Sequence, residues 1–267
     1  MIYREEDDKI MHADLNNYYA SVAGILNPEL KGRAFVVCGD AEKRHGIVLA
    51  KSELAKKAGI KTGETLWSAT KKVPDLVMVP PDFKKYTEYS QKVFDIFTSF
   101  TPNVERFGID ECWLDLTGCT DSGEKTAYEI KDRVLKETGL TLSIGVSFSK
   151  IFAKIGSDLK KPDAVTVINR KNYKDVLYPL SVSAMLFIGS STEKKLNSMG
   201  IRTIGDLAQT DKNLLIRVFG KNGEKIHYFA NGYDETEVTP YTNKHVYESV
   251  GNGVTAKEDI CNMNDLS

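Results

Sequence analysis

The sequence predicts an α+β protein: a ferredoxin-like sheet with a large insertion after its first strand, followed by a small helical region. Three observations predict this fold. Strand-like and helix-like segments between residues 10 and 155 follow the order strand, helix, strand, strand, helix, strand. Residues 18–79 separate the first strand from the first helix. Beyond residue 170 the pattern changes to short helices, and a length of 267 residues suits two or three folding units.

The first strand and the insertion are predicted from alternation and from apolar runs. Residues 10–16, IMHADLN, alternate apolar and polar side chains, which indicates a half-buried strand with an acidic residue near its end. Residues 34–38 and 46–50 are short apolar runs and predict buried strands. Residues 52–58 favour a helix that Gly59 closes.

The remaining elements follow the same two periodicities. Aromatic and aliphatic residues recur at helical spacing from Tyr86 to Phe100 and predict a helix with a strong apolar face. Strands over 104–109 and 112–116 are expected to flank a tight acidic element. The pattern continues with a helix over about 125–138, capped by Gly139, a strand over 141–147 and a helix opening near Ser149. Four glycines are expected between the later helices: Gly200, Gly205, Gly220 and Gly232.

Composition places the chain among soluble, cytoplasmic proteins, with 41% apolar and 27% charged residues. No apolar run reaches the length that spans a bilayer, so no membrane association is expected, and four scattered cysteines suggest reduced thiols. Residues 170–225 hold ten Lys and Arg against five Asp and Glu, a balance of +5. Residues 226–267 hold two against seven, a balance of −5. A DNA-backbone contact surface and a solvated charged face both fit this charge distribution.

Three acidic residues carry the strongest chemical signal. Asp14 ends the first strand, while Asp110 and Glu111 lie between two strands in FGIDECWLD. If both strand ends meet at one edge, the carboxylates repel one another unless a cation neutralises them. Oxygen-only ligation suits Mg²⁺, and two such ions can serve phosphoryl transfer. The alternative is that the Asp-Glu pair simply occupies an exposed hairpin turn.

Three segments in this order, HADLNNYYASV, GIDECWLD and SIGVSFSKIFAKIGSDLKKP, resemble the Y-family DNA polymerases, the lesion-bypass enzymes of the bacterial polymerase IV and UmuC type. The resemblance implies template-directed synthesis across damaged DNA, with primed template DNA and a deoxynucleoside triphosphate as partners. It implies two Mg²⁺ ions held by the three acids and the backbone carbonyl of Leu15. The implied domains are a palm (1–17 and 80–169), fingers (18–79) and a thumb (170–240).

The same resemblance implies a nucleotide site. Tyr19 matches an aromatic steric gate that excludes a ribose 2′-hydroxyl, and Lys161 matches a lysine on the triphosphate. Asn17 and Tyr18 belong to the same expected nucleotide-binding set. The fingers depart from the family pattern after GIVLA, where many relatives have a tyrosine and an arginine facing the triphosphate. Here KSELAKK places Glu53 at the tyrosine position and Lys56 at the arginine position. We therefore expect Lys56 to face the triphosphate as a point charge and expect no such role for Glu53. Lys51 is a possible substitute.

The segment LFIGSSTEKKLNSMGIRTIGDLA resembles the helix-hairpin-helix of the family's thumb, in which backbone amides hold a DNA phosphate. The implied DNA-binding residues are Gly189, Ser190 and Lys194. The usual Pro-Gly-Ile-Gly turn is Leu-Phe-Ile-Gly here, so a positive φ at Phe187 would be strained; the turn is either remodelled or binds DNA more weakly. A plain helical hairpin remains the alternative.

Residues 241–267 match the start of a further DNA-gripping domain, the little finger, so the chain is expected to be a palm, fingers and thumb portion. A sliding clamp is expected to dock through the missing C-terminal region. Two other functions stay open. A nucleotide cyclase also uses a palm-like sheet with a carboxylate-bearing hairpin, and a non-catalytic DNA-binding repair accessory protein would keep the fold without the chemistry.

Overall fold

The structure, a computed structural model, describes residues 8–39, 46–242 and 249–251. It divides into two compact units: Met1–Asn16 with Tyr89–Tyr241, and Asn17–Glu88 with Thr242–Ser267. We call them unit 1 and unit 2. The little-finger prediction for residues 241–267 lies mostly outside the described residues. None of the helices in the described parts of the chain is both long and apolar enough to cross a membrane.

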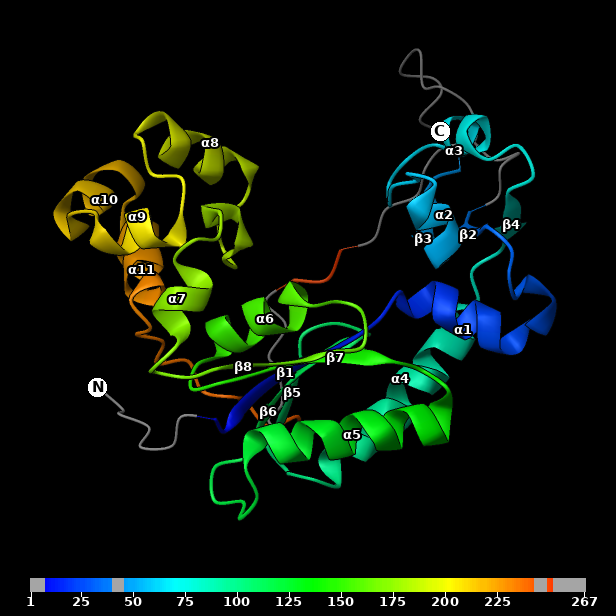
Figure 1. The fold of residues 1–267 in the computed structure, drawn as a ribbon, viewed down its shortest axis with the longest axis horizontal. Helices are drawn as coiled ribbons and strands as arrows, with labels where there is room; N and C mark the ends of the chain where they lie inside the picture. Colours follow the sequence, from blue (N-terminus) through cyan, green and yellow to red (C-terminus); the bar gives the residue numbers. More distant parts are fainter. Residues whose placement is uncertain (1–7, 40–45, 243–248, 252–267) are drawn as a thin grey trace. The chain divides into compact units, whose positions relative to one another are not determined.

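Unit 1 contains a five-stranded sheet in the order β5-β6-β1-β7-β8 (Figure 1). The strands are β1 (Ile10–Leu15), β5 (Val104–Arg106), β6 (Glu111–Asp115), β7 (Leu142–Ser147) and β8 (Val165–Ile168). Strand β1 pairs antiparallel with both β6 and β7, and β8 is added parallel to β7. The four strands β5, β6, β1 and β7 have the ferredoxin-like arrangement, which confirms the predicted fold class.

Helices cover both faces of this sheet (Figure 1): α5 (Gly123–Thr138) one face and α6 (Lys150–Leu159) the other. Successive strand residues point to opposite faces, and the pair Gly145 and Val146 on β7 shows this. A Cβ on Gly145 would lie 1.9 Å from the carbonyl oxygen of Ala153 on α6, so only glycine allows this close approach. The side chain of Val146 instead faces Gly123 at the start of α5.

Local sequence signals set the ends of these helices. Ser122 and Ser149 accept hydrogen bonds from the backbone N–H groups of Lys125 and Phe152, which caps α5 and α6. Gly139 ends α5 with φ 74°, the left-handed conformation that the sequence predicted for a capping glycine. The first helix of the ferredoxin-like pattern is α4 (Phe83–Thr98).

One predicted strand, over 104–109, ends well before its expected bound because the chain turns earlier. The predicted strand over 104–109 stops at Arg106, since the backbone N–H groups of Phe107 and Gly108 both point to the carbonyl oxygen of Glu111. These bonds close the turn that carries Asp110. Two short strands were not predicted: β8, and β4 (Val77–Val79) in unit 2.

The second half of unit 1 is helical and shares a hydrophobic core with α6. Its elements are α7 (Tyr173–Leu177), the 3₁₀ turn Val182–Ala184, α8 (Ser190–Ser198), α9 (Ile204–Gln209), α10 (Lys212–Phe219) and α11 (Lys221–Ala230). Leu196, Leu207 and Ile226 are fully buried in this core beside Phe152 of α6. Each such side chain contributes about 1.5–3 kcal/mol through burial.

Gly205 does not separate two helices, contrary to the prediction. It lies inside α9, where an added Cβ would stand 3.1 Å from Cβ of Tyr178. The glycine therefore permits close helix packing and does not make a turn. Gly200, Gly220 and Gly232 do lie between or after helices, with positive φ angles.

Unit 2 contains a three-stranded sheet in the order β3-β2-β4. Its elements are α1 (Tyr18–Leu26), the 3₁₀ turn Pro28–Leu30, β2 (Phe35–Cys38), β3 (Val48–Lys51), α2 (Glu53–Lys57), α3 (Leu66–Lys72), β4 and the first residues of α4. Val36, Val48 and Ala69 are completely buried between the sheet and the helices. Gly59 has φ 83° just after α2, as the sequence predicted for a helix-closing glycine.

Candidate active site

The pairing of β1 with β6 brings the acidic residues of unit 1 together. Asp14 and Glu111 are direct cross-strand partners. The backbone N–H of Leu15 donates to the carbonyl oxygen of Asp110 at 3.0 Å, which joins the end of β1 to the turn before β6. Asp14 is 5% exposed. The three acids predicted from the sequence therefore lie at one edge of one sheet.

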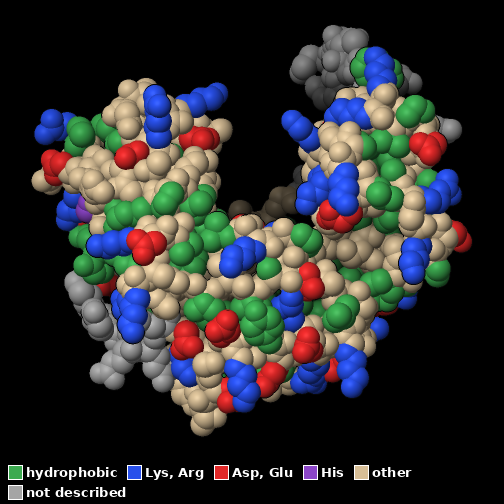
Figure 2. Space-filling view, in the orientation of Figure 1, with side chains coloured by type: hydrophobic (Ala, Val, Ile, Leu, Met, Phe, Trp, Pro, Cys, Tyr) green, Lys and Arg blue, Asp and Glu red, His purple; other side chains and the backbone are tan. Residues whose placement is uncertain are grey.

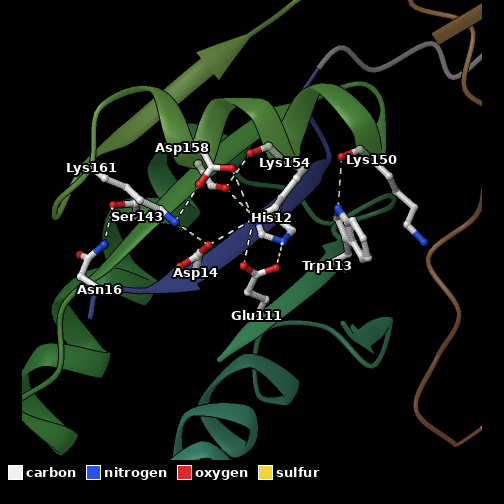
Figure 3. Close-up of polar contacts among 11 residues, drawn as sticks. His12, Asp14, Asn16, Glu111, Trp113, Ser143, Lys150, Lys154, Asp158 and Lys161 are labelled. Atoms are coloured by element: carbon white, nitrogen blue, oxygen red, sulfur yellow. Dashed lines mark hydrogen bonds and ion pairs between the residues drawn. The ribbon is translucent and has the colours of Figure 1, made fainter. Parts of the chain in front are cut away.

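Two lysines neutralise part of the negative charge at this edge (Figure 3). Lys154 of α6 donates to Oε1 of Glu111 at 2.9 Å and to Oδ2 of Asp14 at 3.2 Å. Lys161, in the loop after α6, donates to the same Oδ2 of Asp14 at 2.6 Å. The sequence predicted Lys161 at a nucleotide site but missed Lys154. Helical spacing was the available signal for Lys154. In AKIGSDLKK, Asp158 is four residues after Lys154 and three before Lys161, and it pairs with both.

The carboxyl groups remain under electrostatic stress despite the lysines. Burial, followed by the charges of Asp14 and Glu111, raises the pKa of Asp110 from 3.8 to about 6. Burial and the neighbouring Glu111 also raise the pKa of Asp14, and Lys161 offsets part of this shift. Burial alone would lower the pKa of Lys154, but its bond to Glu111 and the charges of Asp14 and Asp158 outweigh burial, so the pKa is raised. The carboxylates at this site thus carry more negative charge than the two lysines neutralise.

His12 lies beside Asp14 and Glu111 as a buried, neutral group (Figure 3). Burial, then the charge of Lys154, lowers its pKa to about 3. Nδ1 of His12 and the hydroxyl of Ser157 share a hydrogen bond at 2.8 Å, and the same hydroxyl lies 2.8 Å from the carbonyl oxygen of Lys154. Nε2 of His12 stands 3.5 Å from Oε2 of Glu111 and has no hydrogen-bond partner among the described residues.

Asn16 fixes the loop that carries Lys161. Its Oδ1 accepts the backbone N–H of Asp163 at 2.8 Å, and its Nδ2 donates to the hydroxyl of Ser143 on β7 at 3.0 Å. The loop is therefore anchored to two strands of the sheet. Sequence analysis did not single out Asn16, because the position of its long-range partners depends on the fold.

A divalent cation fits these residues by their chemistry. Carboxylate and carbonyl oxygens are the ligands that Mg²⁺ prefers, and the raised pKa values of Asp14 and Asp110 indicate a need for positive charge. Across residues 8–39, 46–242 and 249–251, no three His, Cys, Asp or Glu side chains are arranged to hold an ion together. Lys154 and Lys161 contact the acids instead, so ion binding requires the lysines to move.

Unit 2 holds the aromatic residues of the predicted nucleotide site. The ring of Tyr19 stacks on that of Tyr86, with centroids 4.2 Å apart and planes at 16°, and meets Phe83 edge-on. Tyr18 is 3% exposed, and its hydroxyl donates to the backbone carbonyl of Tyr86. The structure therefore gives Tyr18 a packing role, with little of its ring accessible to a nucleotide. Tyr19 packs against the rings of Tyr86 and Phe83.

The altered residues of the predicted fingers form a polar group of their own in unit 2. The Asn17 amide donates to the carboxylate of Glu53, and Lys56 lies 3.7 Å from the same carboxylate. Burial, then the charge of Lys56, lowers the pKa of Lys51. Figure 2 shows Lys and Arg side chains gathered over α2 and β3 on the face in view. Two predicted nucleotide-binding residues, Asn17 and Lys56, are thus tied to one carboxylate.

The predicted DNA-binding turn in unit 1 keeps a positive φ at position 187, although Phe187 replaces the usual glycine there. Phe187 has φ 71°, so the turn is not remodelled, and the backbone of this non-glycine residue is strained. Its half-exposed ring lies 5.9 Å from the ring of Phe229, and Nζ of Lys225 stands 3.9 Å above it. Gly189 and Ser190 are exposed at the start of α8, and Lys194 is exposed one turn later.

Comparisons with known proteins agree with this geometry. The impB/mucB/samB family matches residues 13–158, and the thumb domain of DNA polymerase-iota matches residues 187–234. The chain is 47% identical over 260 residues to DNA polymerase IV of Acetivibrio thermocellus, covering 96% of this chain and 65% of the relative. It is 38% identical over 261 residues to DNA polymerase IV 1 of Bacillus subtilis, covering 96% of this chain and 62% of the relative. The chain thus spans less than two thirds of the length of these relatives.

Solved structures give the same result. DinB from Sulfolobus solfataricus matches with a TM-score of 0.77 and 29% identity over 85% of this chain and 68% of that one. The insertion ternary complex of Dbh DNA polymerase matches with a TM-score of 0.80 and 27% identity over 86% of this chain and 69% of that one. The chain belongs to the impB/mucB/samB family, and the predicted resemblance to the Y-family DNA polymerases is confirmed.

Proposed function

We propose that this chain carries the nucleotidyl-transfer part of a DNA polymerase that copies primed templates, damaged ones included. The convergence of Asp14, Asp110 and Glu111 at one sheet edge beside two lysines carries the proposal. Transfer of a nucleotidyl group requires mainly positioning and charge neutralisation, and this arrangement suits both. The relatives named DNA polymerase IV support it.

Each residue of the edge has a role in this proposal. Asp14, Asp110, Glu111 and the carbonyl of Leu15 would hold two Mg²⁺ ions, which when bound supply an activated primer hydroxyl and stabilise the leaving pyrophosphate. Lys161 would move from Asp14 to the triphosphate, while Asn16 keeps its loop in place. The negative charge of the three acids would then be balanced by the ions, as the lysines balance part of it when no ion is bound.

In unit 2, the ring of Tyr19 would lie against the sugar and exclude ribonucleotides. Its stack on Tyr86 supports this role, because a ring that is held in place cannot move aside for a 2′-hydroxyl. Tyr18 would support it from within the core. Lys56 and the Asn17 amide would turn from Glu53 to the triphosphate.

The remaining assignments are proposed on the same basis. The palm would comprise residues 1–17 and 80–169, the fingers 18–79 and the thumb 170–240, with a little finger beginning at 241. Gly189, Ser190 and Lys194 would contact a DNA phosphate without reading bases. A sliding clamp would bind through a region beyond this chain, and the protein would act in the cytoplasm.

Primer extension tests the proposal. The chain is incubated with a primed template, deoxynucleoside triphosphates and Mg²⁺, and the primer is sized on a gel. Stepwise lengthening directed by the template is expected, on an undamaged template and on one with an abasic site. Release of a cyclic nucleotide without extension would identify a cyclase instead. DNA binding without either product would favour a repair accessory protein.

A further inference from the structure

Asp158 is the acid that Lys154 and Lys161 share (Figure 3). It lies on α6, one turn beyond Lys154, and is 50% exposed at its side chain. Its Oδ1 is 2.8 Å from Nζ of Lys161, and its Oδ2 is 3.4 Å from Nζ of Lys154. Each lysine therefore bridges Asp158 on one side and the carboxylates of the sheet edge on the other.

Cation binding at the sheet edge would put the lysines in conflict with the ions. Asp14 contacts both lysines and Glu111 contacts Lys154, and these two acids are also proposed ligands of the cations. Ions on these acids would repel the two ammonium groups. A free lysine side chain regains rotamer entropy, so it would extend into solvent unless another partner held it. Asp158 contacts both lysines from outside the acid edge.

We propose that Asp158 is a positioning residue: it keeps the ammonium groups of Lys154 and Lys161 at the edge of the sheet, where they meet the triphosphate of the incoming nucleotide. This inference rests on the proposed function. Asp158 itself touches neither substrate nor ion. It holds the two flexible lysine side chains in place while their partners change from the acids to the triphosphate.

Two simpler roles for Asp158 make different predictions. As an exposed helix pair with Lys154, it would contribute only slightly to stability and nothing to nucleotide binding. As a bare negative charge near the site, it would repel the triphosphate, so its removal would tighten nucleotide binding. Only positioning predicts weaker binding when the charge is removed.

The test is nucleotide affinity of Asp158→Asn in a complex with primed DNA whose primer ends in a 2′,3′-dideoxynucleotide, so that no chemistry occurs. The probe is the deoxynucleoside triphosphate complementary to the template, titrated in Mg²⁺. We expect affinity to fall by about three- to tenfold. With an ordinary primer, KM for the nucleotide should rise by the same factor while kcat changes less than about twofold. Asp158→Glu should recover most of the loss.

The matched control is Asp121→Asn, because Asp121 is also 50% exposed and lies 2.8 Å from a lysine, Lys125, at the same i,i+4 spacing. It should bind nucleotide as the unchanged chain does. In a background with Lys154 and Lys161 both changed to Ala, Asp158→Asn should have no further effect on nucleotide affinity, since both lysine partners of Asp158 are gone.

Unchanged or tighter nucleotide binding by Asp158→Asn overturns the inference alone. A full effect of Asp158→Asn in the lysine-free background overturns it as well. Failure of the unchanged chain and of Asp121→Asn to bind nucleotide or extend a primer overturns the proposed function, and the inference with it.

Discussion

The backbone N–H of Leu15 donates to the carbonyl oxygen of Asp110 at 3.0 Å, so the end of β1 is fastened to the turn before β6. This bond fixes Asp14 and Glu111 as direct cross-strand partners with Asp110 beside them. The fold thus holds three carboxyl groups close together. The raised pKa values of Asp14 and Asp110 record the energetic cost.

Asp110→Asn should stabilise the chain at neutral pH when divalent ions are chelated. The folded protein binds the Asp110 proton more tightly than the unfolded chain, because its pKa rises from 3.8 to about 6. The free energy of unfolding should therefore fall as pH rises through this window, and the amide removes that fall. Above pH 6 the variant should be more stable by about 1–3 kcal/mol. Denaturant unfolding between pH 4 and 7 measures this, with Asp121→Asn as control; parallel curves for Asp110→Asn and the unchanged chain would refute it.

Tyr19→Ala should relax sugar selection. Removing the ring opens space for a 2′-hydroxyl, so the ratio of ribonucleotide to deoxynucleotide incorporation should rise at least about tenfold, or 1.4 kcal/mol. Single-nucleotide insertion kinetics give the ratio. Tyr18→Phe is the control, since its buried ring is kept and only the bond to Tyr86 is lost. An equal fall in both rates would mean that Tyr19 is only a packing residue.

Glu53→Gln should strengthen binding of the incoming nucleotide. The Glu53 carboxylate accepts a hydrogen bond from the Asn17 amide and lies 3.7 Å from Lys56. Its negative charge would repel a triphosphate. For exposed groups such effects are modest, so we expect an affinity gain of about two- to fivefold. Glu64→Gln in the same unit is the control, because Glu64 pairs with Lys72 at 2.7 Å. Weaker nucleotide binding by Glu53→Gln would show that Glu53 instead holds Lys56 in a productive position.

The strain at Phe187 can be isolated by comparing two substitutions. Phe187→Ala loses the contacts with Phe229 and Lys225 but keeps a Cβ at φ 71°. Phe187→Gly loses the same contacts and also the strain, which costs about 1–2 kcal/mol for a non-glycine residue in this conformation. The glycine variant should therefore unfold at higher denaturant concentration than the alanine variant. The reverse order would mean that the turn relaxes to a negative φ once the ring is gone.

Much of the acidic edge could be predicted from the sequence because its signals are local. An alternating strand ending near Asp14 and a hairpin around Asp110 and Glu111 suffice to bring the acids to one edge. The position of Gly139 likewise required only the end of a helical pattern and a residue that tolerates positive φ.

Other features depend on contacts between distant segments and could not be read locally. Lys154 reaches Asp14 because α6 packs across β1, and Asn16 holds residue 163 because β8 follows that loop. The place of Gly205 inside a helix depends on Tyr178, which packs directly against it. Strand β8 has only four residues, and its pairing with β7 defines it more than its own pattern does.

The proposed chemistry is tested most directly by primer extension with Glu111→Gln and Asp110→Asn beside Asp121→Asn. All three variants should fold, as judged by denaturant unfolding. With Mg²⁺ and deoxynucleoside triphosphates, the unchanged chain and Asp121→Asn should extend the primer, while Glu111→Gln and Asp110→Asn should fall to background, because each loses a charged oxygen ligand. Mg²⁺-dependent extension by folded Glu111→Gln at the rate of the unchanged chain would contradict the assignment of this sheet edge as the catalytic site.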